Sequence, residues 1–105
     1  MRVDRSYIEK HYAPEDVRVV VALQNIMAQY KPNSDMHVLA KRFRARVTTK
    51  GSDLGEDFYR DTEKAVKDVL AGFKKDHPLD SIKKYRMARA NKDPFSAANI
   101  RWVHK

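Results

Sequence analysis

The stretch HVLAKRFRARVTT, residues 37–49, decides the expected fold because its second half alternates basic and apolar residues. The alternating residues are Arg42, Phe43, Arg44, Ala45, Arg46 and Val47. Successive side chains of a β-strand point to opposite faces, so the pattern predicts a strand over residues 37–49 with one apolar face and one arginine face. Residues 50–53 are typical of a turn, and residues 54–59 are predicted to return as an antiparallel second strand.

Two segments on either side of this hairpin predict helices. Residues 14–30 begin with Pro14, which suits the first helical position, and their broad apolar face is typical of a helix buried in the core or against another subunit. The second helix is capped by Asp61 or Thr62, has apolar residues at helical spacing, and ends before His77 and Pro78.

The C-terminal part is predicted to contain a third, shorter helix and a docked tail. The helix is expected from Asp80 or Ser81 to Ala90, with Lys83, Lys84, Arg86 and Arg89 available to solvent. Apolar residues of the tail are expected to anchor the terminus on the domain. These residues are Phe95, Ile100, Trp102 and Val103.

Together these elements predict an α+β fold, with a small antiparallel sheet of two to three strands packed on helices and an apolar N-terminal helix. A length of 105 residues predicts one domain, residues 1–105. We expect a helical N-terminal segment over residues 1–35, a strand-turn-strand-helix unit over residues 36–75, and a basic helix with an anchored tail over residues 76–105.

The formal net charge of +8 comes from residues 41–105 alone. Residues 1–40 hold five basic and five acidic residues, whereas residues 41–105 hold 17 basic and nine acidic ones. The excess falls in two groups, over residues 41–50 and 83–105, which flank a slightly acidic stretch. Two basic groups around a near-neutral scaffold indicate a surface that binds a polyanion, above all nucleic acid.

The candidate nucleic-acid-binding residues are ten basic side chains from these two groups. They are Lys41, Arg42, Arg44, Arg46, Lys50, Lys83, Lys84, Arg86, Arg89 and Arg101. Alternate side chains of a strand lie about 7 Å apart on one face, so the strand arginines would contact neighbouring phosphates or guanine in the major groove. The second group would hold backbone phosphates. A solvated strand face and a solvated helix face are the alternative interpretations.

The composition excludes several other kinds of site. The chain has no cysteine, and therefore no disulfide and no thiolate metal site. Its four histidines lack the short spacing of metal ligands, and there is no Gly-rich phosphate loop. No apolar run approaches the roughly 18 residues that span a membrane, and the first residues are not a secretory signal. We predict no catalytic residue, no metal, no cofactor and no membrane contact.

The central segment resembles AP2-type and integrase arm-type DNA-binding domains. The residues that carry the resemblance are KRFRARV (residues 41–47), Gly51, Phe58 and DTEKA (residues 61–65). It covers about residues 40–75. The resemblance implies that the sheet lies in the major groove of DNA and that Arg42, Arg44 and Arg46 contact the DNA.

The tail PFSAANIRWV, residues 94–103, resembles the tail of phage-type HNH endonucleases, which often carry AP2-like modules. His77 and Asn91 are similar to parts of the ββα-metal arrangement of those enzymes. Metal-dependent cleavage needs a base and convergent metal ligands, and the sequence supplies no set that provides both. We therefore interpret the tail as a structural clip, in which Asn99 satisfies backbone groups and Trp102 packs on the domain.

The leading hypothesis is a small, non-enzymatic DNA-binding protein of phage or mobile-element type that acts as a regulator, with DNA favoured over RNA. The alternatives are a basic module that binds and inhibits a host protein, and a degenerate or active HNH-like nuclease. A homodimer through residues 14–30 would double the basic surface. We expect a cytoplasmic location in a bacterial or phage-infected cell.

Overall fold

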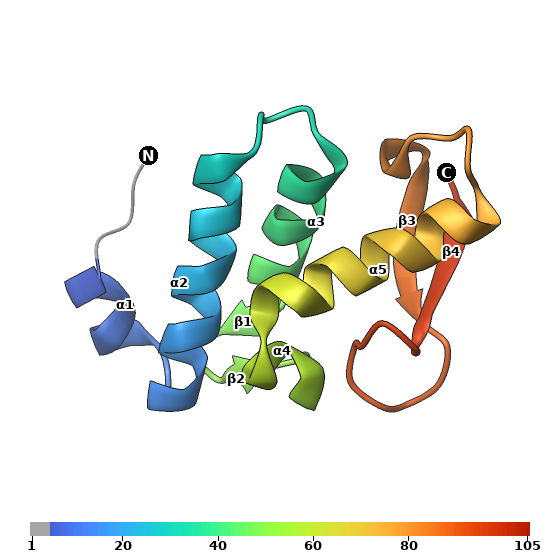
Figure 1. The fold of residues 1–105 in the computed structure, drawn as a ribbon. Helices are drawn as coiled ribbons and strands as arrows, with labels where there is room; N and C mark the ends of the chain where they lie inside the picture. The colour runs from blue at the N-terminus through green and yellow to red at the C-terminus, as the bar shows by residue number, and fades with distance from the viewer. Residues whose placement is uncertain (1–4) are drawn as a thin grey trace.

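The computed structural model describes residues 5–105, which form α-helices and two small antiparallel sheets (Figure 1). The helices are α1 (Arg5–His11), α2 (Pro14–Gln29), α3 (Asp35–Arg44), α4 (Glu56–Arg60), α5 (Thr62–Asp76) and the 3-10 helix η1 (Ile82–Lys84). The strands are β1 (Val47–Thr48), β2 (Gly51–Ser52), β3 (Tyr85–Arg89) and β4 (Ile100–His104). β1 pairs with β2, and β3 pairs with β4. The fold is α+β with small sheets, as predicted.

The predicted helices, over residues 14–30 and from the Asp61 or Thr62 cap to residue 76, are confirmed as α2 and α5. Pro14 opens α2, and the Asp61 carboxylate caps α5 by accepting a hydrogen bond from the Lys64 N–H (3.2 Å). The apolar face of α2 is buried in the core of the chain itself; its buried apolar residues are Val17, Val19, Val20, Leu23 and Ile26. The feature that suggested a dimer is therefore accounted for within one chain, and the dimer stays a prediction.

The predicted strand over residues 37–49 is wrong for most of its length, because this segment forms the helix α3. The Ser34 hydroxyl caps α3 by accepting a hydrogen bond from the His37 N–H (3.3 Å). The buried residues of α3 have the spacing of one helical face: Met36, Leu39, Ala40 and Phe43. Strand structure is confined to Val47–Thr48, which pairs with Gly51–Ser52 through a turn. Gly51 has φ +136°, a value that glycine adopts readily.

The second predicted strand, residues 54–59, is also wrong, since α4 takes up most of this segment. Glu56 and Asp57 lie in the first turn of α4, where acidic side chains favour the positive end of the helix dipole. The third predicted helix is wrong as well. Residues 82–84 form one 3-10 turn, and residues 85–89 form β3.

One hydrophobic core joins α1 through the β3–β4 hairpin. Phe43 of α3 lies at its centre, with its ring centroid 4.7 Å from that of Phe58 and 6.4 Å from that of Phe95. α5 runs along the molecule from the helical part to the β3–β4 hairpin (Figure 1). There Phe73 packs against Trp102, with ring centroids 4.9 Å apart. In the part of the chain that the structure describes, no helix has the length and hydropathy needed to cross a bilayer.

Replacement of Phe43 by alanine should lower the free energy of unfolding by about 3–5 kcal/mol, because it removes a fully buried ring that contacts two others. Leu79 is 97% exposed and is the matched control; Leu79→Ala should change stability by less than about 0.5 kcal/mol. Urea unfolding of the two variants makes the comparison. Equal losses would contradict this description of the core.

Candidate nucleic-acid interface

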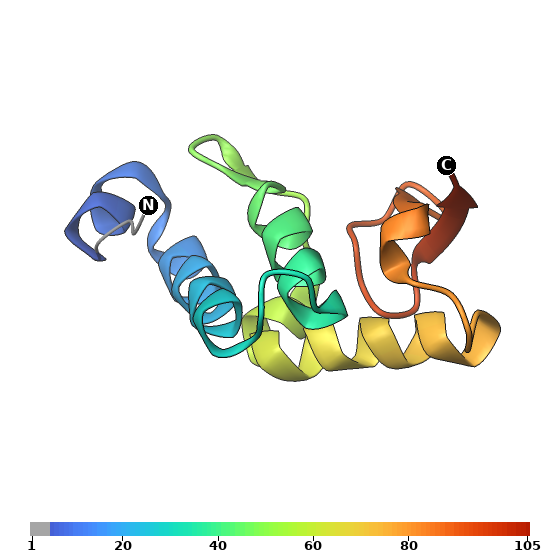
Figure 2. The ribbon, with the colours of Figure 1, turned by 90° about the horizontal axis from the view of Figure 1, so that it is seen from above.

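A groove of about 700 Å³ separates the C-terminal end of α3 from the β3–β4 hairpin. We name it the basic groove after its lining residues, which are Arg42, Ala45, Arg46, Arg86, Met87, Ala88, Arg101, Val103 and Lys105. Five of these residues are basic, and none is acidic or aromatic. Figure 2 shows the β1–β2 and β3–β4 hairpins on the same side of α5, which brings the two basic groups of the sequence to facing walls.

The pairing of β3 with β4 gives the hairpin one basic and one aromatic face. Arg86 lies opposite Val103, and Ala88 lies opposite Arg101. Because alternate residues of a strand share a face, these four residues point to the same side of the hairpin, where they line the basic groove. The other face packs on α5. Its residues include Tyr85 and Trp102, whose ring centroids lie 5.4 and 4.9 Å from that of Phe73.

The loop between β3 and β4 is attached to the segment between β2 and α4. The Phe95 N–H donates to the Asp53 carbonyl (2.8 Å), and the Gly55 N–H donates to the Phe95 carbonyl (2.7 Å). The Phe95 ring is buried against Phe43. A Cβ atom at position 55 would lie 3.1 Å from the Phe95 carbonyl oxygen, so any other residue there would force this close contact to widen. This attachment sets the position of one wall of the groove relative to the other.

The Asn99 side chain forms hydrogen bonds to backbone groups of the same loop. Its Nδ2 donates to the carbonyls of Asp93 (2.8 Å) and Pro94 (3.1 Å), and its Oδ1 accepts from the Asn91 N–H (3.2 Å). The side chain is buried, so these bonds satisfy its polar atoms. The predicted roles of Asn99 as a clip and of Trp102 as a packing residue are confirmed.

Asp53 partly neutralises the charge of Arg46 at the end of the groove nearest the β1–β2 hairpin. The Arg46 guanidinium lies 3.8 Å from the Asp53 carboxylate and 4.9 Å above the centroid of the Phe95 ring. Asp53 also pairs with Arg89 at 3.1 Å. In contrast, among residues 5–105 the side chains of Arg86 and Arg101 have no ion-pair or hydrogen-bond partner. Their charges are fully available to an anion.

Arg42 is the least solvated cation of the groove. Its Nη2 donates to the Ile82 carbonyl (3.4 Å), and its Nη1 is buried without a partner among the described residues. Burial lowers the pKa of the Arg42 guanidinium from its ordinary value, and the Asp35 carboxylate offsets part of this change. The group still carries its charge at neutral pH. An anion in the groove would compensate for this poorly solvated charge.

The structure separates several of the ten predicted site residues. Arg42, Arg46, Arg86 and Arg101 line the basic groove. Lys50 lines an adjoining hollow of about 380 Å³ that also contains Arg46. The predicted common face of Arg42, Arg44 and Arg46 is wrong, since Arg44 lines a different hollow on the side of α1.

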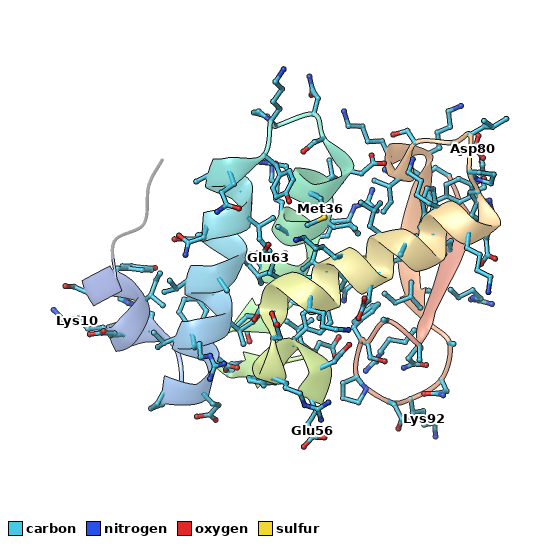
Figure 3. All side chains as sticks on the ribbon, viewed as in Figure 1. Lys10, Met36, Glu56, Glu63, Asp80 and Lys92 are labelled. Atoms are coloured by element: carbon cyan, nitrogen blue, oxygen red, sulfur yellow. The ribbon has the colours of Figure 1, made fainter. Side chains whose placement is uncertain are left out.

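Other predicted residues lie outside these three hollows. Lys41 is exposed on α3, Lys83 donates to the Asn33 side chain (3.5 Å), Lys84 is exposed on η1, and Arg89 pairs with Asp53. Lys92 belongs to the second basic group but is not among the ten candidates, and Figure 3 shows it on the outer edge of the loop that joins β3 to β4.

Sequence reasoning did not place Lys105 in the site. The signal for it was present as the period-two pattern Arg101-x-Val103-x-Lys105, which puts all three residues on one strand face. A strand pairing between residues 85–89 and 100–104 is needed to use that signal. The predicted third helix over residues 80–90 is incompatible with this pairing.

The residues that resemble an HNH site lie in structural positions. The His77 ring packs on Phe73 and Tyr85, with centroids 5.2 and 4.4 Å apart, and Asn91 takes part in the hydrogen bonds of the β3–β4 loop. Within residues 5–105 there is no cluster of three His, Asp or Glu side chains that could hold a metal ion.

Comparisons of the chain with protein-family models, with curated proteins and with solved structures found no match. The AP2-like and HNH-like resemblances therefore stay interpretations of the sequence.

Replacement of Asn99 by alanine should lower the free energy of unfolding by about 1–3 kcal/mol, because it leaves buried backbone groups of the loop without partners. Asn25, exposed on α2, is the matched control, and Asn25→Ala should cost less than about 0.5 kcal/mol. Chemical denaturation measures both, and an unaffected Asn99→Ala protein would show that the loop does not depend on this side chain.

Proposed function

We propose that this chain is a non-enzymatic DNA-binding protein and that it holds the DNA backbone in the basic groove. The observation that carries the proposal is the lining of that groove, which contains five basic residues and no acidic one. Guanidinium groups suit phosphate oxygens because they offer paired donors in a planar fork. Such a protein of a phage or mobile element would act as a regulator by occupying its DNA site.

The chemistry of the groove favours the backbone of duplex DNA. Proteins that hold single strands usually stack the bases on aromatic side chains, and no aromatic residue lines the basic groove. Arg42, Arg44 and Arg46 do not form a common strand face, so a sheet that reads the major groove is not part of the proposal. Phosphate contacts from two walls would make binding strongly dependent on salt.

The double variant Arg86→Ala/Arg101→Ala should weaken binding to a duplex by about tenfold or more at low salt and should lower the slope of log K against log[salt] by about 2. Both side chains are exposed, so the fold should be unchanged. Fluorescence anisotropy over a series of salt concentrations measures both quantities.

The matched control is Arg18→Ala/Arg60→Ala, which removes the same charge from exposed residues of α2 and α4 outside the groove. It should change the affinity much less. Equal effects of the two double variants would contradict the groove as the binding site. Failure of the unaltered protein to bind any nucleic acid at about 50 mM salt would contradict the proposed function and favour an acidic protein partner.

Asp53→Asn should tighten duplex binding by roughly threefold at low salt, because it removes the carboxylate that pairs with Arg46 and Arg89. The gain should disappear at high salt, where exposed charges are screened. The backbone hydrogen bonds of residue 53 do not involve the carboxylate and should be retained. Weaker binding by the variant in the same anisotropy assay would contradict the proposed contact of Arg46 with phosphate.

A further inference from the structure

A third hollow, of about 290 Å³, shares Ala45 with the basic groove. We name it the tyrosine pocket, and its lining residues are Tyr7, Ile8, Tyr12, Val20, Gln24, Arg44, Ala45 and Val47. It combines an apolar floor with two phenol rings, one amide and one guanidinium. Its volume is at the lower end of the roughly 300–1,000 Å³ of small-molecule pockets, which suits a ligand of a single ring system.

Two polar side chains of the tyrosine pocket have no hydrogen-bond or ion-pair partner among the residues that the structure describes. Gln24 and Arg44 are half-buried, and in the part of the chain that the structure describes their side chains make no hydrogen bond or ion pair. Their donor groups are therefore free to pair with a bound ligand. The Tyr7 ring is 49% exposed and is held by stacking on His11, with ring centroids 3.9 Å apart and an interplanar angle of 18°.

The tyrosine pocket and the basic groove are neighbours along the backbone. Ala45 lines both of them, while Arg44 lines the pocket and Arg46 lines the groove. Two Cα–Cα steps of 3.8 Å place the Cα atoms of Arg44 and Arg46 at most about 7.6 Å apart. A ligand held in the groove can therefore reach the pocket by crossing one exposed alanine.

We propose that the tyrosine pocket receives one unpaired nucleobase at the end of a DNA duplex whose backbone lies in the basic groove. The proposal rests on the proposed function. Phenol rings offer stacking surfaces for any base. The Arg44 guanidinium and the Gln24 amide can form hydrogen bonds with base edges, because arginine pairs with guanine and glutamine with adenine. The chain would then distinguish a duplex with an overhanging nucleotide from a blunt one.

The test compares two duplexes of equal length and sequence, one blunt and one with a single 2-aminopurine nucleotide overhanging at one end. Stacking of the extra base should make the overhanging duplex bind roughly tenfold more tightly in a competition anisotropy assay. The fluorescence of 2-aminopurine should fall on binding. Free adenosine monophosphate should not compete at the concentrations used, because it lacks the duplex that occupies the groove.

The variant Arg44→Ala should remove most of the preference for the overhang and leave the affinity for the blunt duplex within about twofold. The matched control is Lys41→Ala, which removes the same charge from an exposed position of the same helix outside both hollows. It should keep the preference. Tyr7→Ala, a change at a half-exposed ring, gives a second variant, and thermal unfolding of each variant checks that it is folded.

The outcomes separate the two proposals. The nucleobase site would be overturned if the blunt and overhanging duplexes bound equally, or if both pocket variants kept the overhang preference. Neither result would contradict DNA binding in the basic groove. Tight competition by free adenosine monophosphate would identify a nucleotide site that is independent of DNA and would also overturn the nucleobase site. Binding of neither duplex would contradict the proposed function, and this inference with it.

Discussion

The packing of Phe95 against Phe43 is the constraint on which the rest of the structure depends. Phe95 belongs to the loop of the C-terminal hairpin and Phe43 to α3, and their rings meet in the core with centroids 6.4 Å apart. The backbone of Phe95 is held at the same time by the Asp53 carbonyl and the Gly55 N–H. Without this attachment the hairpin would be held by the packing of Tyr85 and Trp102 on Phe73 of α5 and by the contact of η1 with α3. The loop would then no longer fix the basic face opposite Arg42 and Arg46.

The fold was predictable where one local pattern dominates. α2 and α5 have a proline or aspartate start and a helical apolar face, and both were predicted close to their observed bounds. α3 was missed because two periods compete in its sequence. Phe43, Ala45 and Val47 alternate as in a strand, but Met36, Leu39 and Phe43 follow a helix and the Ser34 cap favours it. The segment forms a helix because the longer, helically spaced apolar series buries more surface than the alternating one.

The candidate site was predictable in its charge but not in its geometry. The two basic groups identified Arg42, Arg46, Arg86 and Arg101 as candidates, and these four residues do meet in one groove. Their meeting depends on β3–β4 pairing, which joins residues 11 to 19 positions apart, and on the attachment of Phe95 to Asp53 and Gly55, about 40 positions away. The attachment of Phe95 leaves no periodic signal in either segment alone. Arg44 and Arg46 were expected side by side, but the end of α3 between them sends their side chains to different hollows.

The most direct test of the account is a nuclear magnetic resonance titration of the ¹⁵N-labelled chain with a short DNA duplex. If the basic groove holds the DNA, the largest amide shift changes should appear in both walls of the groove at once, which are the segment of residues 42–46 and the hairpin segment of residues 86–88 with 101–105. The exposed cations outside the groove, such as Lys41 and Lys75, should change little. Shift changes confined to one segment, or centred on α1, α2 or the exposed face of α5, would contradict the account.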